Sequence, residues 1–199
     1  MLRLLGRATS GNVQKVVWAL EEMGLDYQRE DYGRQFGNTG GDYLALNPNG
    51  KVPTLIDGET TIWESNSILR YLANSNGGRF YPAEPGKRAL VDQWMDWQLA
   101  SLNAPYVAIF KESKKAPEER GADFAATAAE LSGLLKVLEG GIQAKGFLPD
   151  AGLTLADICF GPIVKRCLAF PIDTDGLDKL TAWQTSLQER PAFTKAVSG

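Results

Sequence analysis

Residues 47–63 read NPNGKVPTLIDGETTIW, and this stretch decides what kind of fold the chain can adopt. Its Asp57-Gly58 pair is a strong two-residue turn signal, and the apolar residues over 52–56 and 60–63 therefore predict a β-hairpin. Pro53 cannot donate a hydrogen bond to a sheet, so it belongs at the start or the edge of the first strand. The first part of the chain must therefore contain a sheet.

Strand and helix signals alternate around this hairpin. Short strands are predicted at 3–5 and over 26–31, and apolar residues at helical spacing predict helices over 13–20 and 68–73. A further short helix fits before the hairpin. The resulting order, β-α-β-(α)-β-β-α, predicts a small α/β domain over residues 1–79.

The character of the chain changes after a Pro- and Gly-bearing linker at 80–86. No strand pattern follows, so residues 87–199 are predicted to form an all-helical domain. Pro105 predicts a kink in the first long helix or its end. The predicted helices cover 90–102, a segment opened by Pro117-Glu118-Glu119, a segment beginning near Thr154, and 177–189.

Composition excludes several classes of function. The chain has 199 residues, a net charge of −3 and no histidine, which removes Ser-His-Asp and Cys-His hydrolases and most zinc sites. A pI near 5.1 argues against nucleic-acid binding. No apolar run approaches the roughly 20 residues that cross a bilayer. Residues 1–6 are too short for a signal peptide, so the cytoplasm is the expected location and no membrane or metal is expected.

The two cysteines are not expected to form a disulfide. Cys159 and Cys167 are eight residues apart on a predicted helix, about 12 Å at 1.5 Å per residue, which is too far for a disulfide. We interpret both as buried structural thiols.

Three segments could carry chemistry, and each also has a purely structural interpretation. Ser10 at the start of the first helix could cap it, or its hydroxyl could bind an anion together with the free helical N–H groups. Pro53 could simply begin a strand, or a cis Val52-Pro53 bond could leave the Val52 backbone open to an extended peptide. Glu64-Ser65 could cap the next helix, or could hold the ammonium and carboxylate of an amino acid.

A fourth segment, Leu153 to Ile158, has a folding role only. Thr154 and Asp157 form a capping box with Asp in place of the usual Glu, flanked by the hydrophobic-staple positions Leu153 and Ile158.

These segments occur in one order, and in that order the chain resembles the glutathione S-transferases over essentially its whole length. The resemblance is carried by residues 10–16, residues 47–55, Glu64-Ser65 and the Thr154/Asp157 box. The first of these looks like the serine-type motif of phi-like, theta-like and many bacterial members, because neither Tyr nor Cys stands there. The resemblance implies a thioredoxin-like N-terminal domain followed by a C-terminal helical bundle.

The resemblance also implies roles for individual residues. Ser10 would hydrogen-bond the sulfur of glutathione, with Asn12 as its neighbour or substitute, and these two are the expected catalytic residues. The implied glutathione-binding residues are Lys51, Val52, Pro53, Glu64, Ser65, Arg34 and Gln35. An electrophile pocket is expected between the domains, lined by Arg7, Phe36, Tyr106, Ile109 and Phe110.

The function implied is conjugation of glutathione, as co-substrate, to a small hydrophobic electrophile by a cytoplasmic, detoxifying homodimer. A free thiol is only about 3% ionised at pH 7, and a single charge-assisted hydrogen bond can correct this without a histidine base. Two alternatives stay open. One is a glutathione-dependent disulfide oxidoreductase or peroxidase on the same fold, and the other is a non-catalytic binding module.

Overall fold

The computed structural model describes residues 1–143, 146–149 and 152–198, and the chain divides into two compact units. The first unit contains residues 1–83 together with the chain from residue 188 onward. The second unit contains Glu84–Leu187. Each unit is described by itself below.

The first unit is built on a four-stranded mixed sheet in the order β2-β1-β3-β4. The strands are β1 (Leu2–Leu5), β2 (Tyr27–Glu30), β3 (Thr54–Asp57) and β4 (Thr60–Trp63). β1 runs parallel to β2 and antiparallel to β3, and β3 pairs with β4 in the expected hairpin. β3 begins at Thr54 rather than at residue 52, because Pro53 has no N–H to give to the ladder.

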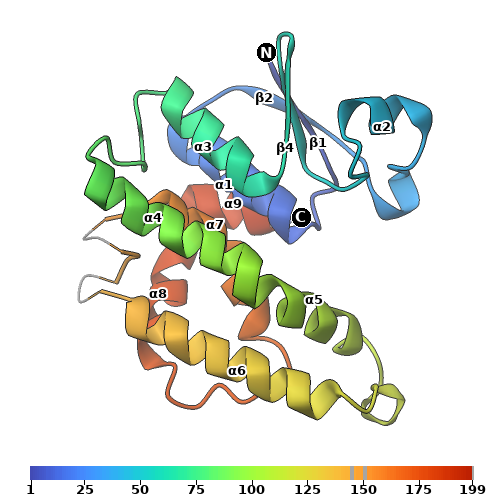
Figure 1. Cartoon of the computed structure of the whole chain (residues 1–199), viewed down its shortest axis with the longest axis vertical. Helices are drawn as coiled ribbons and strands as arrows, with labels where there is room; N and C mark the ends of the chain where they lie inside the picture. Colours follow the sequence, from blue (N-terminus) through green and yellow to red (C-terminus); the bar gives the residue numbers. More distant parts are fainter. Residues whose placement is uncertain (144–145, 150–151, 199) are drawn as a thin grey trace. The chain divides into compact units, whose positions relative to one another are not determined.

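Helices cover this sheet. They are α1 (Gly11–Met23), the short 3-10 helix η1 (Arg34–Phe36), α2 (Gly41–Leu46), α3 (Ser65–Ser75) and α9 (Pro191–Val197). α1 and α3 pack together beside the sheet, α9 lies against α1, and α2 stands apart from them (Figure 1). α1 ends at Met23, and Gly24, with a φ of 68°, closes the helix in the left-handed conformation. The thioredoxin-like expectation for this part of the chain is confirmed.

The end of the chain packs into the first unit, whereas the sequence had placed it with the helical domain. The Phe193 ring meets the Trp18 ring edge to face, with centroids 4.8 Å apart. Arg190 donates two hydrogen bonds to the Glu22 carboxylate, at 2.6 and 2.8 Å. Burial alone would raise the pKa of Glu22, but the hydrogen bonds from Arg190 and Trp18 outweigh it and hold the pKa below its usual range.

The turn between β1 and α1 depends on the absence of a side chain at Gly6. A Cβ on Gly6 would lie 2.5 Å from Val13 Cγ2 and 3.2 Å from Val52 Cβ. Gly6 N–H donates to the Glu30 carbonyl at 2.8 Å, which extends the pairing of β1 with β2. The close approach brings the start of α1 and the segment before β3 together.

The second unit contains only helices among its described residues, as the sequence predicted. They are α4 (Pro85–Trp97), the π-helical turn η2 (Gln98–Leu102), α5 (Asn103–Glu112), the 3-10 helix η3 (Pro117–Glu119), α6 (Phe124–Gly141), α7 (Leu155–Cys167) and α8 (Asp178–Gln188). α5 continues from α4 through η2, α6 runs back alongside α5, and α7 packs against α4 (Figure 1).

One of the two alternatives at Pro105 is wrong, and so is one predicted helix start. Pro105 does not end the long helix, because it lies inside α5, which follows the wider turn of η2. The other alternative, a kink, stays a prediction. Pro117-Glu118-Glu119 does not open the second long helix. It forms the separate η3, and α6 begins only at Phe124. In between, Gly121 N–H donates to the Glu112 carboxylate at 2.8 Å instead of continuing a helix.

The capping box of α7 is confirmed. Thr154 accepts from Ala156 N–H at 3.1 Å, and Asp157 accepts from Thr154 N–H at 2.8 Å. The same carboxylate also accepts from Leu148 N–H and from Trp183 Nε1, at 2.9 and 3.0 Å. Burial raises the pKa of Asp157 to about 7 in spite of these donors, so this carboxyl links the stability of the helical unit to pH.

The described residues carry neither a membrane-spanning helix nor a metal-ligating cluster. No helix among them is long and apolar enough to cross a membrane. They contain no cluster of metal-ligating side chains.

We expect protonation of Asp157 to stabilise the fold. Between about pH 4 and 7 the folded chain holds a proton on this group that the unfolded chain has lost, so this contribution to stability falls as pH rises. The slope can reach about 1.4 kcal/mol per pH unit. In urea unfolding across this range, the free energy of unfolding of the wild type should therefore fall with rising pH relative to that of Asp157→Asn, whose residue 157 does not titrate.

Asp175→Asn, which removes an exposed carboxylate from the same unit, is the control. A constant gap between the wild type and Asp157→Asn would contradict the assignment.

Candidate active site

Ser10 stands at the N-cap position of α1 but does not cap it. Its backbone carbonyl accepts from Gln14 N–H at 2.9 Å, whereas its side chain makes no capping hydrogen bond. Ser10 is nevertheless buried, with 7% of its surface exposed. The capping interpretation therefore does not hold, and Ser10 stands at a helix N-terminus, where an anion is favoured. Asn12 follows in that turn and is half-buried.

The loop before β3 has the cis proline that would leave the Val52 backbone open to an extended peptide. The Val52-Pro53 peptide bond is cis. Within the described part of the chain, no backbone–backbone hydrogen bond involves Val52. Val52 also packs against Gly6, at the beginning of the turn that carries Ser10. The structure thus brings Val52 and the β1–α1 turn together.

Polar side chains donate hydrogen bonds to the carbonyls of this loop. The Tyr43 hydroxyl donates to the Lys51 carbonyl at 2.6 Å, and Asn47 Nδ2 donates to the same carbonyl at 2.7 Å. Both side chains also reach the Thr54 hydroxyl, at 3.0 and 3.1 Å. One residue earlier, Asn38 Nδ2 donates to the Gly50 carbonyl. The loop is therefore held in one conformation by side-chain donors.

Glu64 and Ser65 lie at the start of α3, where the chain leaves β4. Glu64 has a φ of 70°, which is uncommon for a residue other than glycine, and strain of this kind gathers at binding sites. Its side chain does not cap α3, and instead its Oε1 accepts from Asn49 Nδ2 at 3.3 Å. Ser65 is buried in the first turn. The Asn49 contact places the predicted binding segments 47–53 and 64–65 side by side.

Arg7 lies with the glutathione-binding candidates of the first unit. A Cβ on Gly33 would be 2.7 Å from Arg7 Nη1 and 3.4 Å from Val52 Cγ1, so Arg7 and Val52 both pack against Gly33. Sequence reasoning had assigned Arg7 to the electrophile pocket. Its position beside Val52 gives the candidate site a positive charge.

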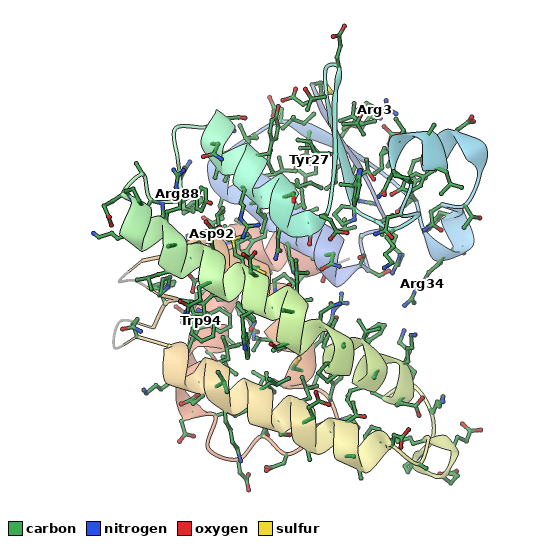
Figure 2. The ribbon with its side chains drawn as sticks, in the orientation of Figure 1. Arg3, Tyr27, Arg34, Arg88, Asp92 and Trp94 are labelled. Atoms are coloured by element: carbon green, nitrogen blue, oxygen red, sulfur yellow. The ribbon has the colours of Figure 1, made fainter. Side chains whose placement is uncertain are left out.

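The residues of η1 are exposed. Arg34, Gln35 and Phe36 form this 3-10 helix, and Figure 2 shows the Arg34 side chain extending away from the sheet. Lys51 is likewise exposed at the loop before β3. The structure thus leaves these cations accessible to an anionic ligand.

The remaining electrophile-pocket candidates all lie on α5 of the second unit. The Tyr106 ring packs against the Phe110 and Phe170 rings, with centroids 6.2 and 6.0 Å away, and its hydroxyl accepts from Arg166 Nη1 at 3.4 Å. Burial raises the pKa of Tyr106 although Arg166 opposes the shift, so the phenol stays protonated and can donate. Ile109 is completely buried and belongs to the core of this unit.

Both cysteines are free and fully buried on α7, as expected. Burial raises the pKa of the Cys167 thiol far above its usual range. Neither thiol has the exposure that a redox cysteine needs.

Sequence reasoning missed the polar support of the loop before β3. Tyr43 and Asn47 are four residues apart, which places them on one side of α2 and its end. That spacing was visible in the sequence. The carbonyl that both side chains would reach was not, because no pattern marks an acceptor in the main chain.

Two family models and a curated relative match the sequence. Residues 9–75 match the family model of the glutathione S-transferase N-terminal domain, and residues 102–191 match that of the C-terminal domain. The glutathione S-transferase GstB of Escherichia coli K12 is 36% identical over 203 residues, covering 99% of this chain and 98% of that protein.

Solved structures of other proteins have the same fold as this chain. A theta class glutathione S-transferase of Xanthomonas axonopodis pv. citri with glutathione bound superposes with a TM-score of 0.93 at 36% identity, covering 100% of this chain and 97% of that one. The glutathione transferase URE2P6 of Phanerochaete chrysosporium, in complex with oxidized glutathione, gives 0.87 at 29% identity, covering 98% and 94%. The chain belongs to the glutathione S-transferase family.

Proposed function

We propose that this protein is a glutathione transferase that ionises the thiol of glutathione and conjugates it to a small hydrophobic electrophile. The observation that carries the proposal is Ser10: a buried hydroxyl at a helix N-terminus that does not cap its own helix. A helix N-terminus attracts an anion, and a hydroxyl there can donate to it. The thiolate, rather than the thiol, is the nucleophile.

The rest of the tripeptide has matching groups in the first unit. We assign the open backbone of Val52, before Pro53, to the cysteinyl part of glutathione. Glu64 and the Ser65 hydroxyl, side by side with this loop through Asn49, are assigned to the γ-glutamyl ammonium and carboxylate. Lys51, Arg34 and Gln35 are assigned to the glycyl carboxylate. The Xanthomonas relative was solved with glutathione bound, which supports the assignment of the ligand.

The conjugation step then needs few groups. Ser10 donates to the sulfur and lowers its pKa, with Asn12 as its neighbour, and the sulfur attacks the electrophile while the leaving group departs or a double bond accepts the pair. We assign Arg7 and Phe36 of the first unit to contacts with the electrophile. We further propose that the protein works as a cytoplasmic homodimer and detoxifies such electrophiles.

Replacement of Ser10 by Ala should lower turnover by roughly 10- to 150-fold, the factor that a hydrogen bond to a charged group is worth. Glutathione affinity should stay nearly unchanged, because the backbone and γ-glutamyl contacts remain. Steady-state kinetics over a pH series should also show the thiol ionising at higher pH. Asn12→Ala is the paired variant, and a larger loss there than in Ser10→Ala would transfer the catalytic role to Asn12.

Replacement of Ser65 by Ala should weaken glutathione binding by about tenfold or more, since a hydrogen bond to a carboxylate is lost. Calorimetric titration with glutathione measures this directly. Ser67→Ala removes an exposed hydroxyl two residues further along the same helix and should bind like the wild type. Equal affinity in all three proteins would remove Ser65 from the site.

A second candidate activity is reduction of another disulfide or of a peroxide by the same activated thiol, with two glutathione molecules supplying the two electrons and leaving as glutathione disulfide. Both protein thiols are buried, so the reducing sulfur would have to come from glutathione itself. Similarity to a transferase solved with oxidized glutathione favours this candidate. Assays of conjugation and of disulfide reduction on one preparation should both lose activity in Ser10→Ala. Activity on disulfides alone would replace conjugation as the main function, and failure to bind glutathione in calorimetry would favour a non-catalytic module.

A further inference from the structure

The Lys51 carbonyl and the Val52 N–H belong to the same peptide unit. This bond is trans, since the only cis bonds among the described residues are Val52-Pro53 and Leu148-Pro149. In a planar trans peptide the C=O and the N–H point in opposite directions. Whatever holds the Lys51 carbonyl therefore also sets the direction of the Val52 N–H.

Two buried side chains hold that carbonyl. The Tyr43 hydroxyl and Asn47 Nδ2 donate to it at 2.6 and 2.7 Å, and only 3% and 2% of these residues are exposed. A carbonyl oxygen has two lone pairs, so both are used. The Tyr43 ring is itself fixed by stacking on Tyr32, with centroids 5.0 Å apart and planes at 29°.

Only one assignment of donors and acceptors satisfies all the hydrogen bonds of this network. The phenol proton of Tyr43 goes to the Lys51 carbonyl, which can only accept, so the Thr54 hydroxyl must donate to the Tyr43 oxygen. Asn47 Nδ2 gives one proton to the Lys51 carbonyl and the other to Thr54. Its Oδ1 accepts from Asn49 N–H at 3.0 Å, which fixes the orientation of the amide. A network with one arrangement holds the peptide plane in one orientation.

We infer that Tyr43 and Asn47 are positioning residues, which hold the Lys51 carbonyl from behind so that the Val52 N–H faces the cysteinyl carbonyl of glutathione. This inference rests on the proposed function, because it assigns the Val52 backbone to glutathione. Neither side chain touches the ligand in this scheme. Their effect is to make the binding hydrogen bond ready before the ligand arrives, which lowers the ordering cost of binding.

The test is Tyr43→Phe, which removes one hydroxyl and keeps the ring on Tyr32. The KM and Kd for glutathione should rise about fivefold, the factor lost with one hydrogen bond. The kcat at saturating glutathione and the KM for the electrophile should stay within about twofold, because Ser10 is untouched. Tyr27→Phe is the matched control. Tyr27 lies on β2 (Figure 2), and its hydroxyl bonds Glu21 at 2.8 Å, so this variant loses a hydrogen bond of the same kind in the same unit. It should leave glutathione affinity unchanged.

A measurement without ligand separates this inference from the proposed function. The residual dipolar coupling of the Val52 N–H reports the direction of that bond, and it should change in Tyr43→Phe and stay constant in Tyr27→Phe. An unchanged coupling, an unchanged affinity, or an equal loss of affinity in both variants would overturn the positioning role. If the wild-type protein binds no glutathione, the proposed function fails, and the coupling alone then decides whether Tyr43 orients Val52.

Discussion

Two valine side chains occupy the space beside the Cα of Gly6, and the arrangement of the candidate site depends on this close approach. Val13 belongs to α1 and Val52 to the loop before β3, and a Cβ on residue 6 would collide with the first and crowd the second. Since protein interiors are packed without spare volume, neither valine could yield without moving its own segment. The absence of one side chain therefore brings the hydroxyl-bearing helix start and the open backbone of Val52 to the same place.

Polar groups and one unusual backbone conformation add to this packing in the candidate site. The Ser10 side chain, at the start of α1, makes no capping hydrogen bond, and the Lys51 carbonyl accepts two hydrogen bonds from buried side chains. At Glu64 a backbone conformation that is unfavourable for a side-chain-bearing residue is kept at the point where β4 meets α3. Each departs from what local sequence preference alone would produce. Such departures concentrate where a protein binds a ligand.

The sequence predicted most of the architecture, because its signals were local. The Asp57-Gly58 turn, the apolar spacing from Val13 to Leu20 and the Thr154/Asp157 box each act within a few residues, and all three were confirmed. The wrong boundaries came from prolines. Pro117 resembles a helix start, but the Gly121 N–H that follows it donates to the Glu112 carboxylate instead of continuing a helix. The contacts of Tyr43 and Asn47 with the Lys51 carbonyl were likewise beyond prediction, since a main-chain acceptor leaves no mark in the sequence.

The last helix has a consequence for how the protein is made. Phe193 and Arg190, near the end of the chain, supply the ring beside Trp18 and the partner of Glu22 on α1. A ribosome releases the N-terminal part first, and domains fold as units while synthesis proceeds. Here the sheet and α1 emerge long before α9, with an indole face and a carboxylate still uncovered. The first unit to appear is thus completed only after the whole helical unit has been synthesised, because α9 follows Glu84–Leu187 in the sequence.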